Sequence, residues 1–397
     1  MTADLAALME ALAPSPVRPS VDWAAICSAF TEIAALSACP QDPVHHAEGD
    51  AGTHTRMVLE ALVAEPAWQA LGEEARRRLF WAAAFHDVGK PSTTVIEDDG
   101  RITSAGHSRA GASIFRSLMW EAGLPMADRE AICGIVLAHQ LPFWLYERPD
   151  VEKMACRVSL SVRPSELLLH AKADALGRVC ADQSDMLDRI ELSASAFEEL
   201  GILDDPFPFA NDESRVAYFE KDDRNPWYAA HEEFRCEATL VCGLPGTGKD
   251  TWIAGNMRGV PTVSLDQVRE DLGIGPLDNQ GKVIQEGFER ARVHLRASRD
   301  FVWNATNVTK NNREKIVRLL RDYNARVKIV YLEVAPDALL SQNHAREATV
   351  PVDAIMRLAR KMEPPHPSEA HEVTWLRDGK VVFGVGGRKD TFPAPRS

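Results

Sequence analysis

The sequence predicts a multidomain protein in which an all-α domain is followed by an α/β domain with a parallel sheet. Residues 1–200 carry apolar side chains at helical spacing almost throughout. From residue 235 onward, short apolar strand candidates alternate with helical patterns, which is typical of βαβ units. The chain has 397 residues, enough for two domains of ordinary size.

We place the all-α domain at 1–200, a linker at 201–234 and the α/β domain at 235–397. The linker is rich in Pro and Asp, with scattered aromatic residues and no helical or strand periodicity. In the first domain, helical patterns include 23–30, 79–85, 132–137 and 167–174. One hairpin interrupts them, with strands near 94–97 and 101–103 joined by an Asp-Gly turn.

Composition excludes several classes of protein. The net charge of −13 argues against non-specific DNA coating, because phosphate binding relies on Lys and Arg. No stretch approaches the roughly 20 apolar residues of a membrane span, and the N-terminus lacks the basic flank of a signal peptide. The seven cysteines form no C-x-x-C pair, so we expect reduced thiols. We therefore expect a cytoplasmic protein without a membrane partner.

Histidine and aspartate residues recur at the ends of successive predicted helices in the first domain. Each residue alone would more often be an ordinary core or surface residue. Together they favour a metal site, because imidazoles and carboxylates are ligands for divalent transition metals. Two such metals, roughly 3.5–4 Å apart, can clamp a phosphate and supply hydroxide. The candidate residues are His54, His86, Asp87, His107, His139 and Asp174.

The stretches FHDVGKPST at 85–93 and GHSRAGA at 106–112 resemble the HD phosphohydrolase superfamily. Their form, and HAEGDAGTH at 46–54, is similar to the HD domains attached to tRNA nucleotidyltransferases. The resemblance implies that one divalent metal is held by His54, His86, Asp87 and Asp174. It implies that Asp87, His107 and His139 contribute to a second. Lys90 would contact the substrate phosphate or assist the leaving group. His45 and His46 fit a ligand position less well, and a substrate contact and a helix-cap role both stay open.

The stretch GLPGTGKDT at 243–251 predicts a phosphate-binding loop, since an apolar strand candidate precedes it and a helix pattern follows. Backbone N–H groups and the helix N-terminus would point at the phosphates of ATP or another NTP. Asp250 stands where Ser or Thr usually ligates Mg²⁺, and we interpret it as a variant Mg²⁺ contact, direct or through water. The expected nucleotide-binding residues are Gly243, Gly246, Thr247, Gly248, Lys249, Asp250 and Thr251.

Further strand candidates of the second domain are 261–265, 301–305 and 328–334, and a hairpin near 374–383 closes the pattern. Asp266 and Arg269 follow the first of these strands, at the sheet edge where ligands of such folds bind. Phosphoryl transfer to a hydroxyl needs a carboxylate that accepts the proton and a cation that positions the acceptor. Asp266 and Arg269 are candidates for these roles, and a plain exposed ion pair is the alternative. The amides in NATN at 304–307 replace the aspartate usual at this strand end.

A basic segment near 340–365 is expected to form a lid in which Arg346 contacts the triphosphate. A solvated basic helix is the alternative. Between Glu286 and Lys361 the sequence has 15 Lys or Arg against nine Asp or Glu. This local excess of six positive charges is compatible with an enzyme that holds a nucleic-acid end, although the whole chain is acidic.

The loop, the Asp-x-x-Arg pair and the arginine lid are similar, in the same order, to the 5′-OH polynucleotide kinases of phage and bacterial RNA repair. With the HD domain before them, nearly the whole chain resembles the bacterial HD-Pnk family of bifunctional RNA end-healing enzymes. The resemblance implies that the HD domain removes 2′,3′-cyclic, 2′- or 3′-phosphates from RNA ends. The kinase domain would phosphorylate 5′-OH ends of RNA, and DNA 5′-OH ends stay open as a second substrate. A separate RNA ligase would seal the product.

Two other functions stay open. In the first, both domains act on small molecules, as a nucleotide phosphohydrolase fused to a nucleoside or sugar kinase. In the second, the phosphate-binding loop is a nucleotide sensor that regulates the HD domain, a reading encouraged by the missing hydroxyl at Asp250.

Overall fold

The computed structural model describes residues 5–275, 278–345 and 349–386. The chain divides into two compact units, Met1–Phe207 and Pro208–Ser397. Among the described residues, no helix is both long and apolar enough to span a membrane.

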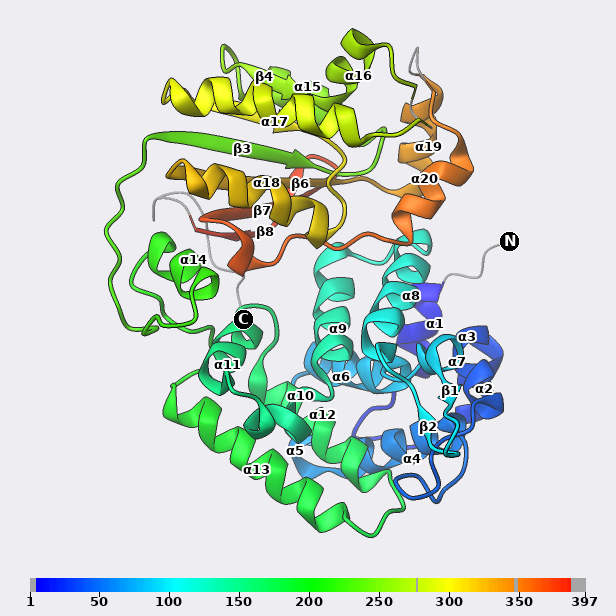
Figure 1. Cartoon of the computed structure of the whole chain (residues 1–397). Coiled ribbons are helices and arrows are strands. Elements are labelled where there is room, and N and C mark those ends of the chain that lie inside the picture. Colours follow the sequence, from blue (N-terminus) through cyan, green and yellow to red (C-terminus); the bar gives the residue numbers. More distant parts are fainter. Residues whose placement is uncertain (1–4, 276–277, 346–348, 387–397) are drawn as a thin grey trace. The chain divides into compact units, whose positions relative to one another are not determined.

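The first unit is almost entirely helical (Figure 1). Its α-helices are α1 (Leu5–Leu12), α2 (Trp23–Ala29), α3 (Thr31–Ala34), α4 (Ala51–Ala64), α5 (Pro66–Ala70), α6 (Glu73–Phe85), α7 (Lys90–Thr93), α8 (His107–Glu121), α9 (Met126–Ala138), α10 (Leu141–Trp144), α11 (Val151–Ser159), α12 (Pro164–Leu176) and α13 (Gln183–Glu199). Two 3₁₀ turns, Ala35–Ala38 and Leu145–Glu147, complete the helical set.

Helix α6 lies at the centre of this unit and packs against α4, α9 and α12. Residues 79–85 of α6 are all fully buried, which explains their unbroken apolar sequence. Phe30 packs edge-on against both Trp81 and Phe85 of this helix, with ring centroids 5.3 Å apart in each pair. The C-terminal end of α6 is therefore held from several sides.

The predicted hairpin of the first unit is confirmed. Strand β1 (Val95–Ile96) pairs antiparallel with β2 (Ile102–Thr103). Gly100 in the connecting turn has φ of +87°, a conformation that glycine adopts without steric cost.

The second unit is built on a six-stranded sheet with the strand order β4-β5-β3-β6-β7-β8. Neighbouring strands are parallel except for the last pair, β7 and β8, which form the predicted hairpin. The predicted fold class, helical and then α/β with a mostly parallel sheet, is confirmed. The strands are β3 (Cys236–Cys242), β4 (Thr262–Ser264), β5 (Phe301–Asn304), β6 (Ala325–Glu333), β7 (Glu372–Arg377) and β8 (Lys380–Val385).

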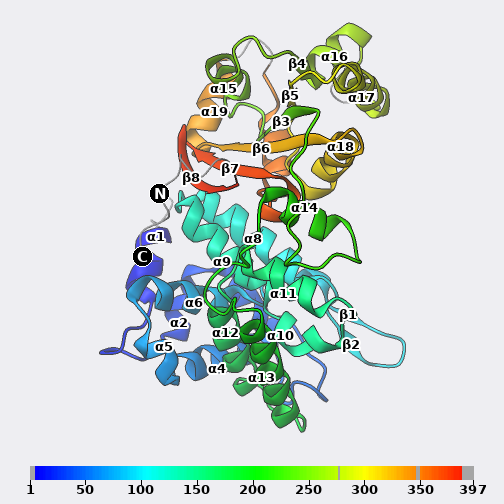
Figure 2. The same cartoon turned by 90° about the vertical axis from the view of Figure 1, so that its left-hand side faces the viewer.

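Helices cover both faces of this sheet (Figures 1 and 2). On one face lie α15 and α19, and Ile253 of α15 packs with Val241 and Val302 of the strands. On the other face lie α17 and α18, and Phe288 of α17 packs against Trp303 of β5. The helices of this unit are α14 (Asp212–Glu220), α15 (Lys249–Asn256), α16 (Leu265–Leu272), α17 (Gly281–Arg296), α18 (Lys310–Asp322), α19 (Pro336–His344) and α20 (Val352–Ala359), with a 3₁₀ turn at Pro367–Glu369.

Residues 201–234, expected to be a linker, contain helix α14. Asn211 caps this helix by accepting a hydrogen bond from the Ser214 N–H. Arg215 of α14 donates hydrogen bonds to the carbonyls of Ala370 and His371, at 3.2 and 2.6 Å. This helix therefore belongs to the second unit. Its sequence is short and polar, and Pro-rich flanks hide it from a periodicity search.

Candidate metal and nucleotide sites

The helices of the first unit deliver the six predicted metal ligands to one buried place. His54 lies in the first turn of α4, and His107 is the first residue of α8. His86 and His139 end α6 and α9, and Asp174 lies on α12. All six residues, Asp87 among them, are at most 5% exposed.

The ligand atoms of this cluster are close to one another. His54 Nε2 lies 3.1 Å from an Asp174 oxygen, and His86 Nε2 lies 3.2 Å from Asp87 Oδ2. The other Asp87 oxygen, Oδ1, lies 3.5 Å from His107 Nε2. Among the described residues, three groups have metal-ligand spacing: His46, Glu48 and His54 form one, His54, His86 and Asp87 the second, and Asp87, His107 and His139 the third. Asp87 is common to the second and third groups.

Three of the imidazoles are oriented in the same way. The Nδ1 atoms of His86, His107 and His139 each lie 2.7 Å from the carbonyl oxygen three residues earlier. Because a carbonyl only accepts, each neutral ring carries its proton on Nδ1 and presents a lone pair at Nε2. This backbone contact is the usual support of a metal-binding histidine.

The lone pairs of His107 and His139 face one another, with their Nε2 atoms 3.2 Å apart. Two lone pairs cannot share a hydrogen bond, so a cation between them is the arrangement that satisfies both. Within the described residues, the buried Nε2 atoms of His54 and His86 have no hydrogen-bond partner either. The donor set and its unsatisfied atoms fit divalent transition metals.

The shifted pKa values of several residues in the cluster favour the binding of cations. Burial lowers the pKa of His107 and His139, so both rings are neutral ligands at neutral pH. Burial opposes ionisation of Asp87, but the neighbouring His86 and Lys90 hold its pKa well below the usual range. Asp174 is likewise kept ionised by Arg178 and His54, and its pKa is well below the usual range. The site therefore presents two carboxylates beside the neutral imidazoles of His107 and His139.

Gly89 allows the loop that follows His86 and Asp87 to pack closely against the start of α8, which carries His107. A Cβ atom on Gly89 would lie 2.1 Å from the His107 carbonyl oxygen and 2.6 Å from the Gly111 nitrogen. The loop after His86 and Asp87 can therefore touch the start of α8 only without a side chain at Gly89.

Lys90 lies beside the cluster, and its ammonium contacts Asp87 Oδ2 at 2.7 Å and Gln41 Oε1 at 2.5 Å. It also lines the cavity that opens from the cluster, as His45 and His46 do. The position suits the expected phosphate contact. His46 Nδ1 is hydrogen-bonded to Glu48 Oε1 at 2.8 Å. This contact is compatible with both expected roles, a substrate contact and a helix cap.

Sequence reasoning missed three residues of this site. Glu48 lies 3.1 Å from His54 Nδ1 and accepts a hydrogen bond from the Val179 N–H, so it orients the His54 ring. Arg178 pairs with Asp174 at 2.9 Å. His170 is fully buried, its ring centroid lies 5.5 Å from that of His86, and neither of its nitrogens has a partner among the described residues. One of them could have been found, because His170 lies four residues before Asp174 on the same face of α12.

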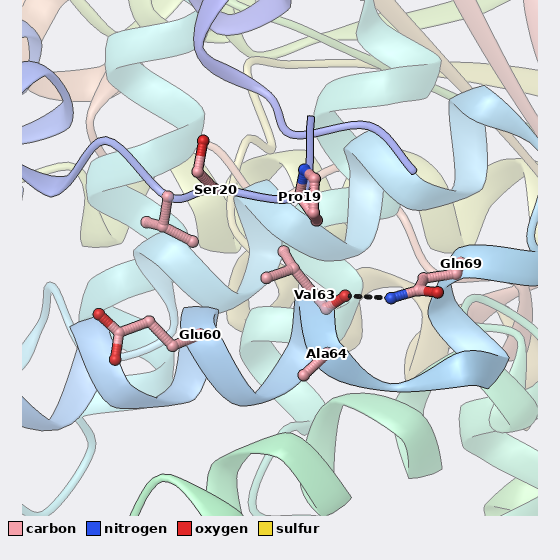
Figure 3. Close-up of a pocket in the computed structure, with 7 residues that line it drawn as sticks. Pro19, Ser20, Glu60, Val63, Ala64 and Gln69 are labelled. Carbon is pink, nitrogen blue, oxygen red and sulfur yellow. Dashed lines mark hydrogen bonds between the residues drawn. The ribbon is translucent and has the colours of Figure 1, made fainter. Parts of the chain in front are cut away.

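A different hollow lies away from these residues, between the segment at 19–21 and helix α4 (Figure 3). Its volume is about 360 Å³, and a hydrogen bond of 2.9 Å from Gln69 to the Val63 carbonyl closes one side. Glu60 is the one charged residue in its lining. This composition offers no catalytic group, and we assign no function to the hollow.

The phosphate-binding loop of the second unit connects β3 to α15, as expected. Gly243, Gly246 and Gly248 have φ of +147°, +89° and +81°, which favours glycine at each position. The loop ends at the N-terminus of α15, where free N–H groups attract anions. Lys249 donates hydrogen bonds from Nζ to the loop carbonyls of Gly243 and Leu244, at 3.0 and 2.9 Å. The lysine thus lies over the loop in which a phosphate would sit.

Thr247 and Thr251 differ in their surroundings. The Thr247 hydroxyl donates to the Leu244 carbonyl at 2.9 Å and is buried, so it stabilises the loop. Thr251 lies in the first turn of α15 and is exposed.

Asp250 contacts the amide that ends β5. Asn304 donates a hydrogen bond from Nδ2 to Asp250 Oδ1 at 2.6 Å. The usual pairing in such folds is a hydroxyl on the loop and a carboxylate at this strand end. Here the carboxylate is on the loop, and the neutral partner is on the strand. Carboxylate oxygen is a preferred Mg²⁺ ligand, so the exchanged pair fits this metal.

The Asp266 and Arg269 pair lies at the same sheet edge. Val241, Asn304 and Ser264 are in register across β3, β5 and β4, and α16 begins directly after Ser264. Asp266 forms an ion pair with Arg269, and Arg269 also donates to Gln280 at 2.8 Å. The Asp266 side chain is 69% exposed, which leaves it accessible to an incoming hydroxyl.

The basic stretch between Glu286 and Lys361 is partly compensated by nearby acids. Many of its cations form ion pairs with carboxylates: Arg290, Arg292, Arg313, Arg321, Arg326 and Lys328. The local excess of positive charge is therefore weaker evidence for a polymeric substrate than the sequence suggests. Arg346 lies outside the described residues, and α19 and α20 flank the gap that contains it.

Two family models match separate parts of the chain. An HD domain model matches residues 52–188, and an AAA domain model matches residues 239–365. The first range contains the histidine cluster, and the second contains the phosphate-binding loop. The chain therefore joins a domain that is similar to HD domains to a phosphate-loop domain that is similar to AAA domains.

Curated relatives match part of the chain only. A Multifunctional CCA protein from Halorhodospira halophila is 35% identical over 166 residues, which is 41% of this chain and 37% of that protein. A CC-adding tRNA nucleotidyltransferase from Thermus thermophilus is 31% identical over 45% of this chain and 37% of its own length. An A-adding tRNA nucleotidyltransferase from Deinococcus radiodurans is 42% identical over 16% of this chain and 15% of its own length. The chain thus spans well under half the length of these relatives.

Two solved structures show limited likeness. An unliganded sugar kinase from Janibacter sp. HTCC2649 has 18% identity and a TM-score of 0.29, over 36% of this chain and 85% of that one. A Chloroflexus aurantiacus protein described as a kinase has 20% identity and a TM-score of 0.31, over 37% of this chain and 87% of that one.

Proposed function

We propose that this protein is a bifunctional RNA end-healing enzyme. The first unit removes 2′,3′-cyclic, 2′- or 3′-phosphates, and the second transfers the γ-phosphate of an NTP to a 5′-OH polynucleotide end. The observation that carries the proposal is the presence, in one chain, of a buried His/Asp cluster with unsatisfied Nε2 lone pairs and a phosphate-binding loop followed by an Asp-x-x-Arg pair. A separate RNA ligase would join the healed ends.

In the first unit, His54, His86, Asp87 and Asp174 would hold one divalent transition metal, and Asp87, His107 and His139 a second. Metals bound there would supply hydroxide from water and polarise the phosphoryl oxygens. Lys90 stands at the cavity wall, where its ammonium can bind a substrate phosphate oxygen or neutralise the leaving oxygen. The buried imidazoles keep their protons on Nδ1 and need no rearrangement.

In the second unit, Asp266 accepts the proton of the attacking hydroxyl, and Arg269 positions the acceptor. Lys249 moves from the loop carbonyls to the outer phosphates and offsets their charge. Arg346 would add a second cation from the segment between α19 and α20. Asp250, oriented by Asn304, would hold Mg²⁺.

A second candidate is a pair of small-molecule enzymes, a nucleotide phosphohydrolase joined to a nucleoside or sugar kinase. The partial compensation of the basic stretch between Glu286 and Lys361 by carboxylates favours this second candidate. Transfer from labelled ATP to a 5′-OH oligoribonucleotide and to mononucleosides separates the two. Label on the oligonucleotide supports end healing, and label on mononucleosides alone overturns it.

A further inference from the structure

The cavity that reaches the histidine cluster also reaches an exposed tryptophan. The cavity has a volume of about 460 Å³. Its lining includes the buried Lys90 and His107 and the half-exposed Trp144. Its volume lies in the range of about 300–1,000 Å³ that is usual for small-ligand sites. One ligand can therefore contact both the buried residues and Trp144.

Trp144 is exposed in a segment that is otherwise buried. The residue is 50% exposed, whereas its neighbours Phe143 and Leu145 are 4% and 0% exposed. A half-exposed Trp at a cavity wall leaves part of its large apolar ring surface open to a ligand. Trp144 ends α10, which begins two residues after His139. The same short segment thus places a metal-ligand candidate and the exposed ring.

An arginine fixes the orientation of this ring. The guanidinium of Arg189 lies 5.1 Å from the Trp144 ring centroid, a cation–π distance. Arg189 is itself held by Glu147 at 2.6 Å and by the Phe143 carbonyl at 3.3 Å. The ring is therefore held in place before any ligand binds, which lowers the entropic cost of stacking.

The charges of the cavity fit one nucleotide rather than a long polyanion. Its lining contains three permanent cations, Lys90, Arg178 and Arg189, and three carboxylates, Asp42, Asp182 and Asp185. The two sets balance, so the lining has little net attraction for a chain of phosphates. A single phosphate can instead bind near Lys90, while carboxylates accept hydrogen bonds from sugar hydroxyls and base N–H groups.

We propose that Trp144 is the stacking surface for the nucleobase of the terminal nucleotide whose phosphate is removed at the histidine cluster. This inference rests on the proposed phosphohydrolase function of the first unit. Stacking uses the π-face that every base has, so it recognises a nucleotide without selecting its sequence. The substrate of this site is therefore an end that carries a base, and an abasic end lacks the contact.

Two 3′-phosphate oligoribonucleotides that differ only in the last nucleotide, one normal and one abasic, test the proposal. With the normal substrate, Trp144→Ala should raise KM about tenfold, in line with the usual effect of one stacked base. With the abasic substrate, KM should not change. Trp144→Phe should recover most of the loss. Tyr146→Ala is the matched control, because Tyr146 is 48% exposed two residues away and does not line the cavity.

An equal effect of Trp144→Ala on both substrates, or no effect on either, would overturn the stacking role. If the wild-type enzyme hydrolyses neither substrate, the proposed function fails. Calorimetric binding of a nucleoside 3′-monophosphate to the metal-loaded wild type and to Trp144→Ala then still decides the stacking question. Weaker binding by Trp144→Ala supports it, and equal binding contradicts it.

Discussion

The Asn304 amide donates a 2.6 Å hydrogen bond to the Asp250 carboxylate, and so joins the end of β5 to the first turn of α15. The acidic group of the expected Mg²⁺ site therefore lies on the loop, and its neutral partner lies on the strand. This exchange accounts for the absence of a Ser or Thr at position 250 without loss of the carboxylate.

Moving the carboxylate from position 250 on the loop to position 304 at the end of β5 should preserve the Mg²⁺ site. Asp250→Ala should raise the Mg²⁺ concentration needed for kinase activity about tenfold or more, because it removes the metal-binding oxygen. Asp250→Ser combined with Asn304→Asp places a hydroxyl on the loop and a carboxylate on β5, and should restore most of the Mg²⁺ affinity. Binding of ATP by calorimetry at several Mg²⁺ concentrations measures this. An unchanged Mg²⁺ dependence in Asp250→Ala would show that the residue is not a metal contact.

Asp266 is expected to act as the general base of the kinase. Asp266→Asn should lower kcat by about 10²–10⁴-fold and leave the KM for ATP nearly unchanged. Asp271→Asn is the control, because Asp271 is on the same helix and pairs with Arg290. Equal losses in the two variants would argue that Asp266 is only part of an exposed ion pair.

Gly89 should be intolerant of substitution. Gly89→Ala places a methyl group 2.1 Å from the His107 carbonyl oxygen, so the start of α8 must shift. We expect a destabilisation of roughly 1–3 kcal/mol, as for other overpacked sites, and weaker metal binding. Gly72→Ala is the control, because no atom lies within 4 Å of its added methyl group. Melting temperature and bound metal per chain provide the measurements. Equal values for the two variants would contradict this account of Gly89.

The metal-free first unit should lose stability as the pH falls. Burial lowers the pKa of His170 to about 3 and also lowers the pKa of His107 and His139, whereas unfolded histidines titrate near 6.5. Below pH 6.5 the unfolded state therefore binds more protons than the folded state. The free energy of unfolding should fall by up to about 1.4 kcal/mol per pH unit for each such histidine.

His54 works in the opposite direction. Burial lowers the pKa of His54, but the carboxylates of Asp174 and Glu48, each 3.1 Å from a ring nitrogen, raise it above 6.5 in total. Its stabilising contribution is complete below pH 6.5 and is lost as the pH rises through its folded pKa. After bound metal is removed with a chelator, hydrogen-exchange protection of the α6 amides between pH 7 and 5 measures the sum of these opposite contributions to the free energy of unfolding. In His170→Leu this free energy should fall less steeply with decreasing pH than in wild type. In the control His231→Leu, which changes an exposed histidine, the slope should match wild type. Equal slopes in wild type and His170→Leu would contradict the assignment.

The sequence was most informative where chemistry and secondary structure coincide. Glycines around Lys249 and histidines at helix ends have spacings that few other structures require, so their place in the fold could be predicted. Glu48 could not be singled out as readily, because its importance depends on segments that meet only in the folded unit. The Asp250–Asn304 contact joins residues that are distant in the chain, and no local pattern reports it. Helix α14 was hidden by its Pro-rich flanks.

The central claim is that one chain carries two separate sites for the two ends of a broken RNA. An oligoribonucleotide with a 5′-OH and a 3′-phosphate, incubated with ATP, Mg²⁺ and a transition metal, tests it most directly. Wild type should modify both ends. His86→Ala should phosphorylate the 5′ end and leave the 3′-phosphate, and Lys249→Ala should do the reverse. Loss of both reactions in either folded variant, or no reaction at either end with wild type, would contradict the account.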